Sequence, residues 1–234
     1  MVGIGPGTNR QLTPQALTAL HEAEVVLGYT TYLRLAAPFI AGKEIVASGM
    51  KQEWTRAEMA VRLAEEGKRV AVVSSGDPGV YGMAGPILEL APKDLEVDVV
   101  PGVTAASAAA AVLGAPLMHD FAVISLSDLL TPWETISRRL AAAAEADFII
   151  VLYNPRSKGR AEHLETARQI ILSRRTSTVT GWVKNCGRAG EVSKLTTLAE
   201  LDTSEVDMFT TVVIGNSSTF VQNGRMITPR GYEK

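Results

Sequence analysis

The sequence predicts an α/β protein made of two α/β halves. Short runs rich in β-branched residues, each about the length of a buried strand, alternate with stretches whose apolar residues recur at helical spacing. Such alternation indicates largely parallel strands covered by helices. The pattern restarts after "GAPLMHD" (114–120). We therefore expect an N-terminal domain over residues 1–115 and a C-terminal domain over residues 116–234.

In the first half, Thr13 before Pro14 predicts the start of a helix, because threonine is a favourable N-cap and proline suits the first helical position. The same periodicity predicts helices at 13–23, 53–67 and 104–114, and strands at 24–29, 43–48, 69–75 and 95–102.

In the second half, the alternation gives way to closely spaced strands. It begins with a strand at 121–126, a helix at 133–146, a strand at 148–154 and a helix at 160–173. Three strand-like runs then follow at 177–185, 191–197 and 209–216. Their short connections leave no room for helical crossovers, so we expect them to be antiparallel.

The composition narrows the class of function. A formal net charge of −2 argues against a nucleic-acid partner, which usually requires a basic excess. No apolar run reaches the ~18 residues that span a bilayer, and no secretory pattern follows Met1. The single cysteine, Cys186, excludes an intrachain disulfide framework. We expect a cytoplasmic protein without a membrane partner.

The opening stretch "VGIGPGTN" carries three glycines, Gly3, Gly5 and Gly7. A dinucleotide fingerprint would need a glycine where Thr8 stands, and a helix that begins at that point. The helix is instead expected from Thr13, which disfavours phosphate binding. Two interpretations remain: a tight structural turn, or a turn that lets a bulky substrate approach the backbone.

Four further loops follow predicted strands, where ligands of α/β sheets usually bind. They are "SSGDPGVYG", "PGVTAAS", "NPRSKGR" and "VKNCGRAGE". Asp77 in the first loop is either a cap for a helix or an acceptor for a ligand. The last two loops hold basic residues that form either a solvated face or a site for a polyanionic small ligand: Arg156, Lys158, Arg160, Lys184 and Arg188.

Metal and nucleophile chemistry find little support. His21, His119 and His163 lack the spacing of metal ligands, so we expect no metal. His21 and His163 fall within predicted helices as surface or packing residues. His119, beside Asp120, is a candidate for acid–base work or a structural bridge. We expect Cys186 to be a small residue that lines a pocket, and not a reactive thiol.

Six motifs in order resemble the tetrapyrrole methylase family. They are "VGIGPGTNRQLT", "SSGDPGVYGMAG", "PGVTAASAAAAVLGAPLMHDF", "LYNPRSKGR", "GRAGE" and "TTVVIGNSST". The chain is most similar to the branch that methylates C17 of precorrin-3B, or cobalt-precorrin-3, in cobalamin biosynthesis. The resemblance implies two α/β domains with a trough between them, a homodimer, and S-adenosylmethionine as methyl donor, with S-adenosylhomocysteine as product.

The resemblance also assigns site residues. The family's methyl-donor contacts fall on Pro6, Ser75, Gly76, Asp77, Val80, Thr104, Ala105, Asn154 and Cys186. Asn154 stands where relatives carry methionine, and Cys186 where they carry a glycine-like residue. The five basic residues suit the carboxylates of a tetrapyrrole substrate.

C17 methylation with ring contraction needs proton transfers, for which His119, Asp120 and Asp77 are the candidates. Two other functions stay open. One is methylation at another tetrapyrrole carbon. The other is nucleotide binding without catalysis.

Overall fold

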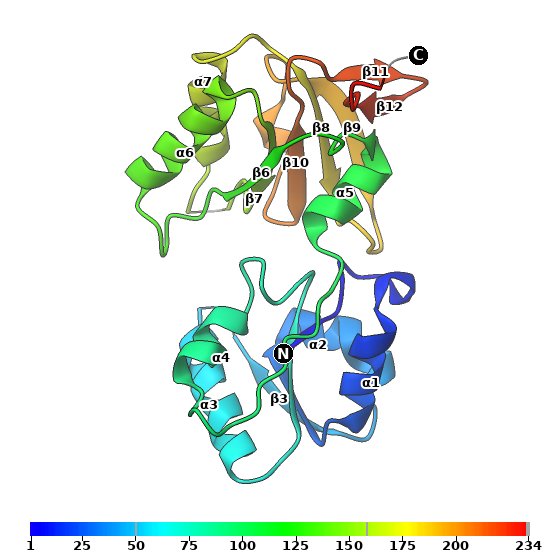
Figure 1. Cartoon of the computed structure of the whole chain (residues 1–234), viewed down its shortest axis with the longest axis vertical. Helices are drawn as coiled ribbons and strands as arrows, with labels where there is room; N and C mark the ends of the chain where they lie inside the picture. The colour runs from blue at the N-terminus through cyan, green and yellow to red at the C-terminus, as the bar shows by residue number, and fades with distance from the viewer. Residues whose placement is uncertain (50, 158, 233–234) are drawn as a thin grey trace. The chain divides into compact units, whose positions relative to one another are not determined.

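The first of two units, Met1–Ala105, runs from blue to green in Figure 1. It is built on a four-stranded parallel sheet in the order β1-β4-β2-β3. The computed structural model describes residues 1–49, 51–157 and 159–232. The strands of this sheet are β1 (Val2–Gly3), β2 (Val25–Tyr29), β3 (Glu44–Ser48) and β4 (Val70–Ser74). The predicted α/β class and the parallel pairing are confirmed.

Helices cover both faces of this sheet. Helices α1 (Pro14–Glu22) and α2 (Thr30–Ala36) pack on one face, and α3 (Glu53–Glu65) and α4 (Ala84–Leu90) pack on the other. The Thr13 side chain accepts a hydrogen bond from the Ala16 N–H, and Pro14 opens the helix, so the predicted cap is confirmed. Short 3-10 turns occur at Asn9–Gln11 and Ala37–Phe39.

The strand predicted at 95–102 is wrong. Only Val100 bridges to β1, opposite Val2. The Gly3 N–H donates to the Val100 carbonyl at 3.0 Å, and the Val100 N–H donates to the Met1 carbonyl at 2.8 Å. Strand β1 is only two residues long, and Pro101 has no N–H to donate. Residues 95–102 therefore cannot form a longer hydrogen-bonded ladder with it.

The second unit, Ala106–Lys234, contains a five-stranded mixed sheet in the order β6-β7-β10-β8-β9. Its strands are β6 (Phe121–Ser125), β7 (Ile149–Tyr153), β8 (Val179–Lys184), β9 (Val192–Thr197) and β10 (Thr210–Ile214). Strands β6 and β7 are parallel, whereas β8, β9 and β10 join by antiparallel pairs, as predicted.

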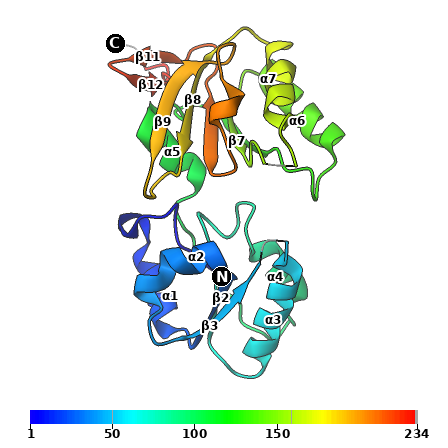
Figure 2. The ribbon, with the colours of Figure 1, turned by 180° about the vertical axis from the view of Figure 1, so that it is seen from behind.

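Helices α6 (Trp133–Glu145) and α7 (His163–Leu172) pack on one face of this sheet through a shared cluster with Leu152 and Trp182. Helix α5 (Ala105–Leu113) lies on the other face, as the view from behind also shows (Figure 2). Gly181 makes this possible. A Cβ atom there would lie 2.8 Å from the Leu113 methyl carbons, closer than packed carbons tolerate.

A small three-stranded sheet completes the second unit. It joins β5 (Gly114–Ala115) to a hairpin of β11 (Phe220–Gln222) and β12 (Arg225–Ile227). The hairpin, which the sequence analysis did not predict, turns on Asn223 and Gly224, both with positive φ. An Asn-Gly pair is the usual signal for such a turn.

The chain divides after Ala105, whereas the predicted domains divide after residue 115. The ten intervening residues pack with later parts of the chain. Leu113 of α5 lies against Gly181, and β5 pairs with β12. Such long-range contacts cannot be read from a local pattern.

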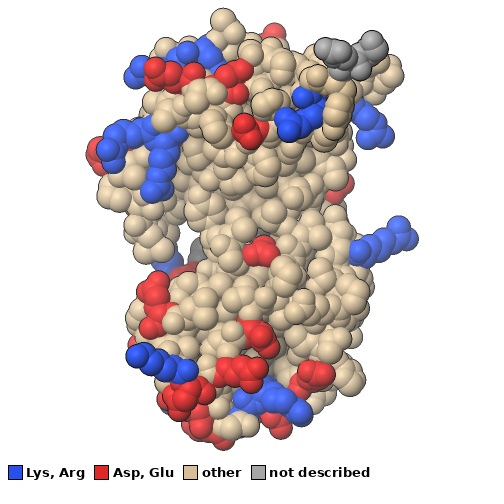
Figure 3. Space-filling view, in the orientation of Figure 1, with Lys and Arg blue, Asp and Glu red and all other residues tan. Residues whose placement is uncertain are grey.

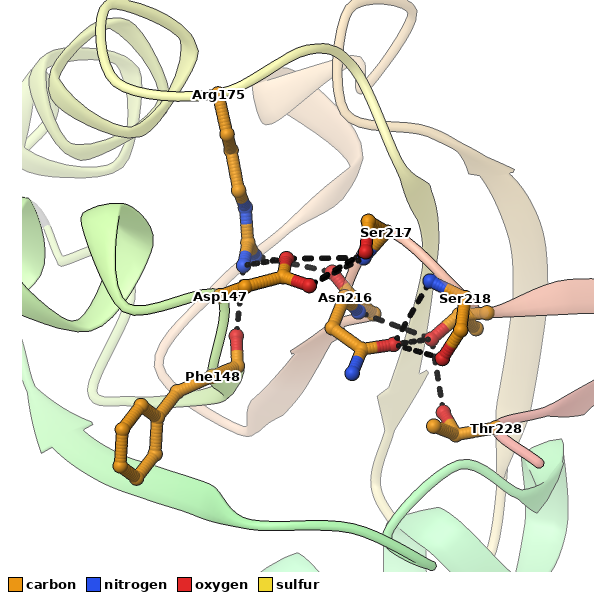
Figure 4. Close-up of polar contacts among 9 residues, drawn as sticks. Asp147, Phe148, Arg175, Asn216, Ser217, Ser218 and Thr228 are labelled. Atoms are coloured by element: carbon orange, nitrogen blue, oxygen red, sulfur yellow. Dashed lines mark hydrogen bonds and ion pairs between the residues drawn. The ribbon is translucent and has the colours of Figure 1, made fainter. Parts of the chain in front are cut away.

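A polar cluster organises the edge of the second sheet where β7 begins and β10 ends (Figure 4). The buried Arg175 guanidinium donates to the carbonyl oxygens of Phe148 at 2.7 Å and Gly215 at 3.0 Å. It also lies 3.5 Å from the Asp147 carboxylate. That carboxylate accepts a hydrogen bond from the Ser217 N–H at 2.9 Å. The cluster therefore fastens β7 to the segment after β10.

Asn216 continues this network through its side-chain oxygen, which accepts hydrogen bonds from the Ser218 hydroxyl at 2.9 Å and the Thr219 hydroxyl at 3.0 Å. The Thr219 and Thr228 hydroxyls are 2.8 Å apart. The "GNSST" motif is thus explained by structural hydrogen bonds at this edge.

Asp147→Ala should lower the free energy of unfolding by about 1.5–3 kcal/mol, because hydrogen bonds to a charged group are lost. Asp147 also has φ +55°, which alanine disfavours and asparagine tolerates. Asp147→Asn should therefore cost less. Urea unfolding followed by tryptophan fluorescence measures both, since Trp133 and Trp182 lie in this unit. Parent-like stability of Asp147→Ala would contradict the role of the cluster.

Candidate functional site

Three glycine loops of the first unit meet where β1 and β4 end. Gly5 and Gly76 exchange backbone hydrogen bonds, at 3.1 Å for the Gly5 N–H and 2.8 Å for the Gly76 N–H. A Cβ atom on Gly102 would overlap the Gly76 carbonyl oxygen, and one on Gly3 would lie 2.6 Å from the Gly102 nitrogen. The close approach of protein backbones therefore requires these glycines, whatever else the loops bind.

Asp77 joins two of these loops through its carboxylate. One oxygen accepts a hydrogen bond from the Gly79 N–H at 2.8 Å, and the other accepts from the Gly102 N–H at 3.0 Å. Neither of the two sequence interpretations, helix cap or ligand acceptor, anticipated this bridge. Because both oxygens already accept backbone hydrogen bonds, the geometry favours a positioning role for Asp77 over proton transfer.

The structure brings together the seven predicted methyl-donor residues of the first unit. Gly76, which has φ +71°, packs against Thr104 and Ala105. A Cβ atom added to Gly76 would lie 3.7 Å from both Thr104 Cα and Ala105 N. Helix α5 begins at Ala105, and the first turn of a helix presents N–H groups that have no intrahelical partner. The seven residues therefore lie on neighbouring loops, in which Gly5 and Gly76 already bond to each other through their backbone groups. They are Pro6, Ser75, Gly76, Asp77, Val80, Thr104 and Ala105.

The carboxyl ends of β7 and β8 carry the predicted residues of the second unit. Both strands run antiparallel to β10, which lies between them, so their carboxyl ends share one edge of the sheet. Asn154 follows β7 with φ +51°, and its side-chain amide donates to the Ser125 hydroxyl at 3.0 Å. Cys186 follows β8 in a tight loop, where its two neighbours, Asn185 and Gly187, have positive φ.

Cys186 is a buried thiol, with 8% of its surface exposed. Burial, together with the negative charge of Glu191, raises its pKa to about 11. The thiol is therefore protonated at neutral pH and is a poor nucleophile. This environment supports the interpretation of Cys186 as a small packing residue of the loop.

The predicted substrate-binding cations that the structure describes follow β7 and β8 at this same edge, and Arg156, Arg160 and Lys184 each bind another part of the protein. Arg156 donates to the Thr203 carbonyl at 3.1 Å, Arg160 donates to the Ser127 hydroxyl, and Lys184 lies 2.6 Å from Asp207. Arg188 is half-buried on the β8–β9 loop. Lys158 falls outside the described residues.

The Lys184–Asp207 ion pair is well formed. Burial alone would raise the pKa of Asp207, but hydrogen bonds from Lys184 and Thr210 outweigh it and lower that pKa. A carboxylate ligand would have to share Lys184 with Asp207. On the face drawn in Figure 3, basic and acidic side chains likewise lie side by side.

His119 and Asp120 lie at the opposite edge of the second sheet. They precede β6, and the Asp120 carbonyl accepts a hydrogen bond from the N–H of Ile149, the first residue of β7. A strand of five residues places them about 13 Å from the carboxyl ends. Both side chains are largely exposed, at 44% for His119 and 82% for Asp120. The structure does not bring them together with Asn154, Cys186 or Lys184.

Residues outside the predicted site also lie at the carboxyl-end edge. The Tyr153 hydroxyl accepts a hydrogen bond from the Ala106 N–H at 2.6 Å, which ties β7 to the first turn of α5. His163, expected to be a surface or packing residue, lies 3.1 Å from Asp128 and stacks edge-on against Trp133. The position of Asp128 just after a predicted strand could have marked it as a candidate. Its pairing with His163, 35 residues away, depends on the fold.

A cavity of about 540 Å³ opens elsewhere in the first unit. It is lined by Met1, the first residues of β4, residues 95–98 and Val100, at the amino ends of the strands. The glycine loops follow the carboxyl ends, so this cavity is not part of the candidate site.

The described residues hold no group of three or more His, Cys, Asp or Glu side chains placed to bind a metal ion. Within the same residues, every helix is too short or too polar to cross a membrane.

Comparison with known proteins gives close relatives. A protein of Salmonella typhimurium named "Probable cobalt-factor III C(17)-methyltransferase" is 51% identical over 236 residues, which cover 99% of this chain and 98% of the relative. The "Cobalt-factor III methyltransferase" of Priestia megaterium is 44% identical over the whole chain. This chain spans 45% of the length of that second relative.

Solved structures agree with these relatives. The crystal structure of the methyltransferase CobJ has a TM-score of 0.92 and 37% identity, covering 97% of this chain and 98% of its own. A uroporphyrin-III C-methyltransferase from Thermus thermophilus, complexed with S-adenosylhomocysteine, has a TM-score of 0.69 and 27% identity, covering 92% and 95%. The family model of the tetrapyrrole (corrin/porphyrin) methylases matches residues 1–202. This chain belongs to the tetrapyrrole methylase family.

Proposed function

We propose that this chain transfers a methyl group from S-adenosylmethionine to C17 of a precorrin-3B or cobalt-factor III type tetrapyrrole, with contraction of the ring. The observation that carries the proposal is the 51% identity, over almost the full length of both chains, to a relative named for C17 methylation. The methyl donor is supported by the solved relative that holds S-adenosylhomocysteine. The ring contraction is what the resemblance to the C17 branch implies.

The glycine loops suit a methyl donor that is bound by backbone groups. S-adenosylmethionine supplies an electrophilic methyl group, so the protein needs neither a nucleophile of its own nor a metal for the transfer. What it must supply is a fixed geometry between donor and acceptor carbon. Asp77 contributes by fastening the Gly76 loop to Gly102, and the loops meet without side chains in the way.

The carboxyl-end edge of the second sheet suits an acceptor with carboxylate groups. Arg156 and Arg160 follow β7 at this edge, Lys184 ends β8, and Arg188 follows β8. The Nε of Arg160 is buried and has no hydrogen-bond partner within the described residues. Guanidinium groups can bind carboxylates with two parallel hydrogen bonds. These cations therefore orient the acceptor, at the expense of some contacts they make within the protein.

His119 and Asp120 do not enter this proposal as catalytic groups, because they lie at the other edge of the sheet from the basic residues. Asp77 enters as a positioning residue. The proton transfers of ring contraction are therefore assigned to no side chain of this chain.

We also infer that the protein acts in the cytoplasm as a homodimer. One buried thiol requires no oxidising compartment. The dimer is what the resemblance implies, and sedimentation analysis of the purified chain would reveal a monomer if it is wrong.

The deciding experiment is an anaerobic incubation with isotope-labelled S-adenosylmethionine and precorrin-3B or cobalt-factor III. The product should gain one labelled methyl at C17, and its absorption spectrum should change because contraction alters the conjugated path. A methyl at another carbon of an intact ring would reject the C17 assignment but keep the family. No transfer to any tetrapyrrole would overturn the proposed function.

Asp77→Ala should weaken S-adenosylhomocysteine binding about tenfold or more, because two backbone N–H groups lose an acceptor worth about 1–3 kcal/mol each. Isothermal titration calorimetry measures the affinity. Asp94→Ala removes an exposed aspartate of the same unit and should leave the affinity unchanged. Equal affinities for all three proteins would place the donor away from these loops.

Cys186→Ser should retain most methyl transfer, because the buried thiol has a raised pKa of about 11 and no covalent role. In the parent, alkylation of Cys186 by iodoacetamide should be slow at pH 7 and accelerate as the pH approaches 11, since only the thiolate reacts. Loss of turnover in Cys186→Ser, with donor affinity unchanged, would instead indicate nucleophilic catalysis.

A further inference from the structure

The loop between β6 and α6, residues 126–132, is tightly anchored at its start. The Leu126 N–H donates to the Tyr153 carbonyl at 2.9 Å, and the Leu126 side chain is fully buried. Arg160 donates to the Ser127 hydroxyl, and His163 lies 3.1 Å from the Asp128 carboxylate. Three consecutive residues are therefore held by the neighbouring β7 strand and the loop and helix that come after it.

The tip of the same loop is apolar and exposed. Leu129 is 62% exposed and Leu130 is 98% exposed. Single exposed leucines are common on proteins, but two adjacent ones on an anchored loop are less readily explained. The anchoring contacts involve the residues before the tip, so the two leucines are presented in a defined place.

The place is the carboxyl-end edge of the second sheet. The loop follows β6, whose carboxyl end is in register with that of β7, Ser125 opposite Tyr153. Asn154 and Arg156 leave β7 at this edge, and Arg160 reaches the loop itself. An apolar pair thus lies near cations that the proposed function directs to carboxylates.

A tetrapyrrole combines these two chemistries, since it has a broad apolar ring system and a rim of carboxylates. We propose that Leu129 and Leu130 contact the ring face of the tetrapyrrole, and that Asp128 with His163, and Ser127 with Arg160, hold the leucines in position. The inference rests on the proposed function. It adds the side chains that would distinguish a macrocycle from a small polar anion.

The leucines and their anchors have separate roles in this arrangement. Leu129 and Leu130 contact the substrate, whereas Asp128 is a positioning residue that acts only through the loop. Asn in place of Asp128 keeps an acceptor oxygen for His163, so a positioning role predicts rescue by Asp128→Asn but not by Asp128→Ala.

The test measures binding of uroporphyrin III, a carboxylated tetrapyrrole, by quenching of tryptophan fluorescence, in parallel with calorimetry of S-adenosylhomocysteine. The Leu129→Ala/Leu130→Ala variant should bind uroporphyrin III about tenfold more weakly, since apolar burial is lost. Its S-adenosylhomocysteine affinity and thermal midpoint should not change. Leu88→Ala, which removes an exposed leucine of α4, is the matched control and should bind both ligands as the parent does.

Asp128→Ala should also weaken uroporphyrin III binding, and Asp128→Asn should restore most of it. Parent-like binding of uroporphyrin III by the double leucine variant would overturn the inference and leave the proposed function standing. The inference would also be overturned if Leu88→Ala weakened uroporphyrin III binding as much as the double leucine variant does. A parent chain that binds neither uroporphyrin III nor S-adenosylhomocysteine would overturn the proposed function and this inference together. Should the double variant lose stability, Leu130→Ala alone, at a position 98% exposed, gives the same comparison.

Discussion

The backbone contact among Gly3, Gly76 and Gly102 is the constraint on which the candidate donor site depends. Three loops can lie this close only because none of these residues has a side chain, and the Asp77 carboxylate then fastens two of the loops by accepting backbone hydrogen bonds. The arrangement holds the three loops close together at the carboxyl ends of β1 and β4, as a site that positions a ligand requires.

The two edges of the second sheet differ in the side chains they carry. At one edge, Arg175 and Asp147 bond to backbone groups of Phe148, which precedes β7, and of the segment after β10. At the other edge, the loops after β6, β7 and β8 carry basic and apolar side chains that the core does not require. Ligand sites in α/β proteins form at such carboxyl-end edges because loops can vary there without disturbing the strands.

The cations of this edge show how a sequence pattern and a structure differ. Arg156, Arg160 and Lys184 were expected to form a solvated face or a site for a polyanionic ligand, yet each has a partner from a distant part of the chain. Asp207, which pairs with Lys184, is 23 residues away in sequence. Ion pairing depends on which loops the sheet brings together, so the spacing of charges along the chain could not reveal it.

Local patterns determined most of the elements in this protein, including the Thr13 cap and the antiparallel strands after residue 177, because periodicity, caps and connection lengths act over short distances. The full set of motifs also determined the family. Only the tertiary structure decided that 95–102 is not a strand, since that depends on the length of β1. Only it placed His119 and Asp120 away from the basic residues, because strand direction decides which end of a sheet a residue occupies. The bridge from Asp77 to Gly102 and the pairing of Asp128 with His163 likewise join residues at least 25 positions apart, which no local pattern encodes.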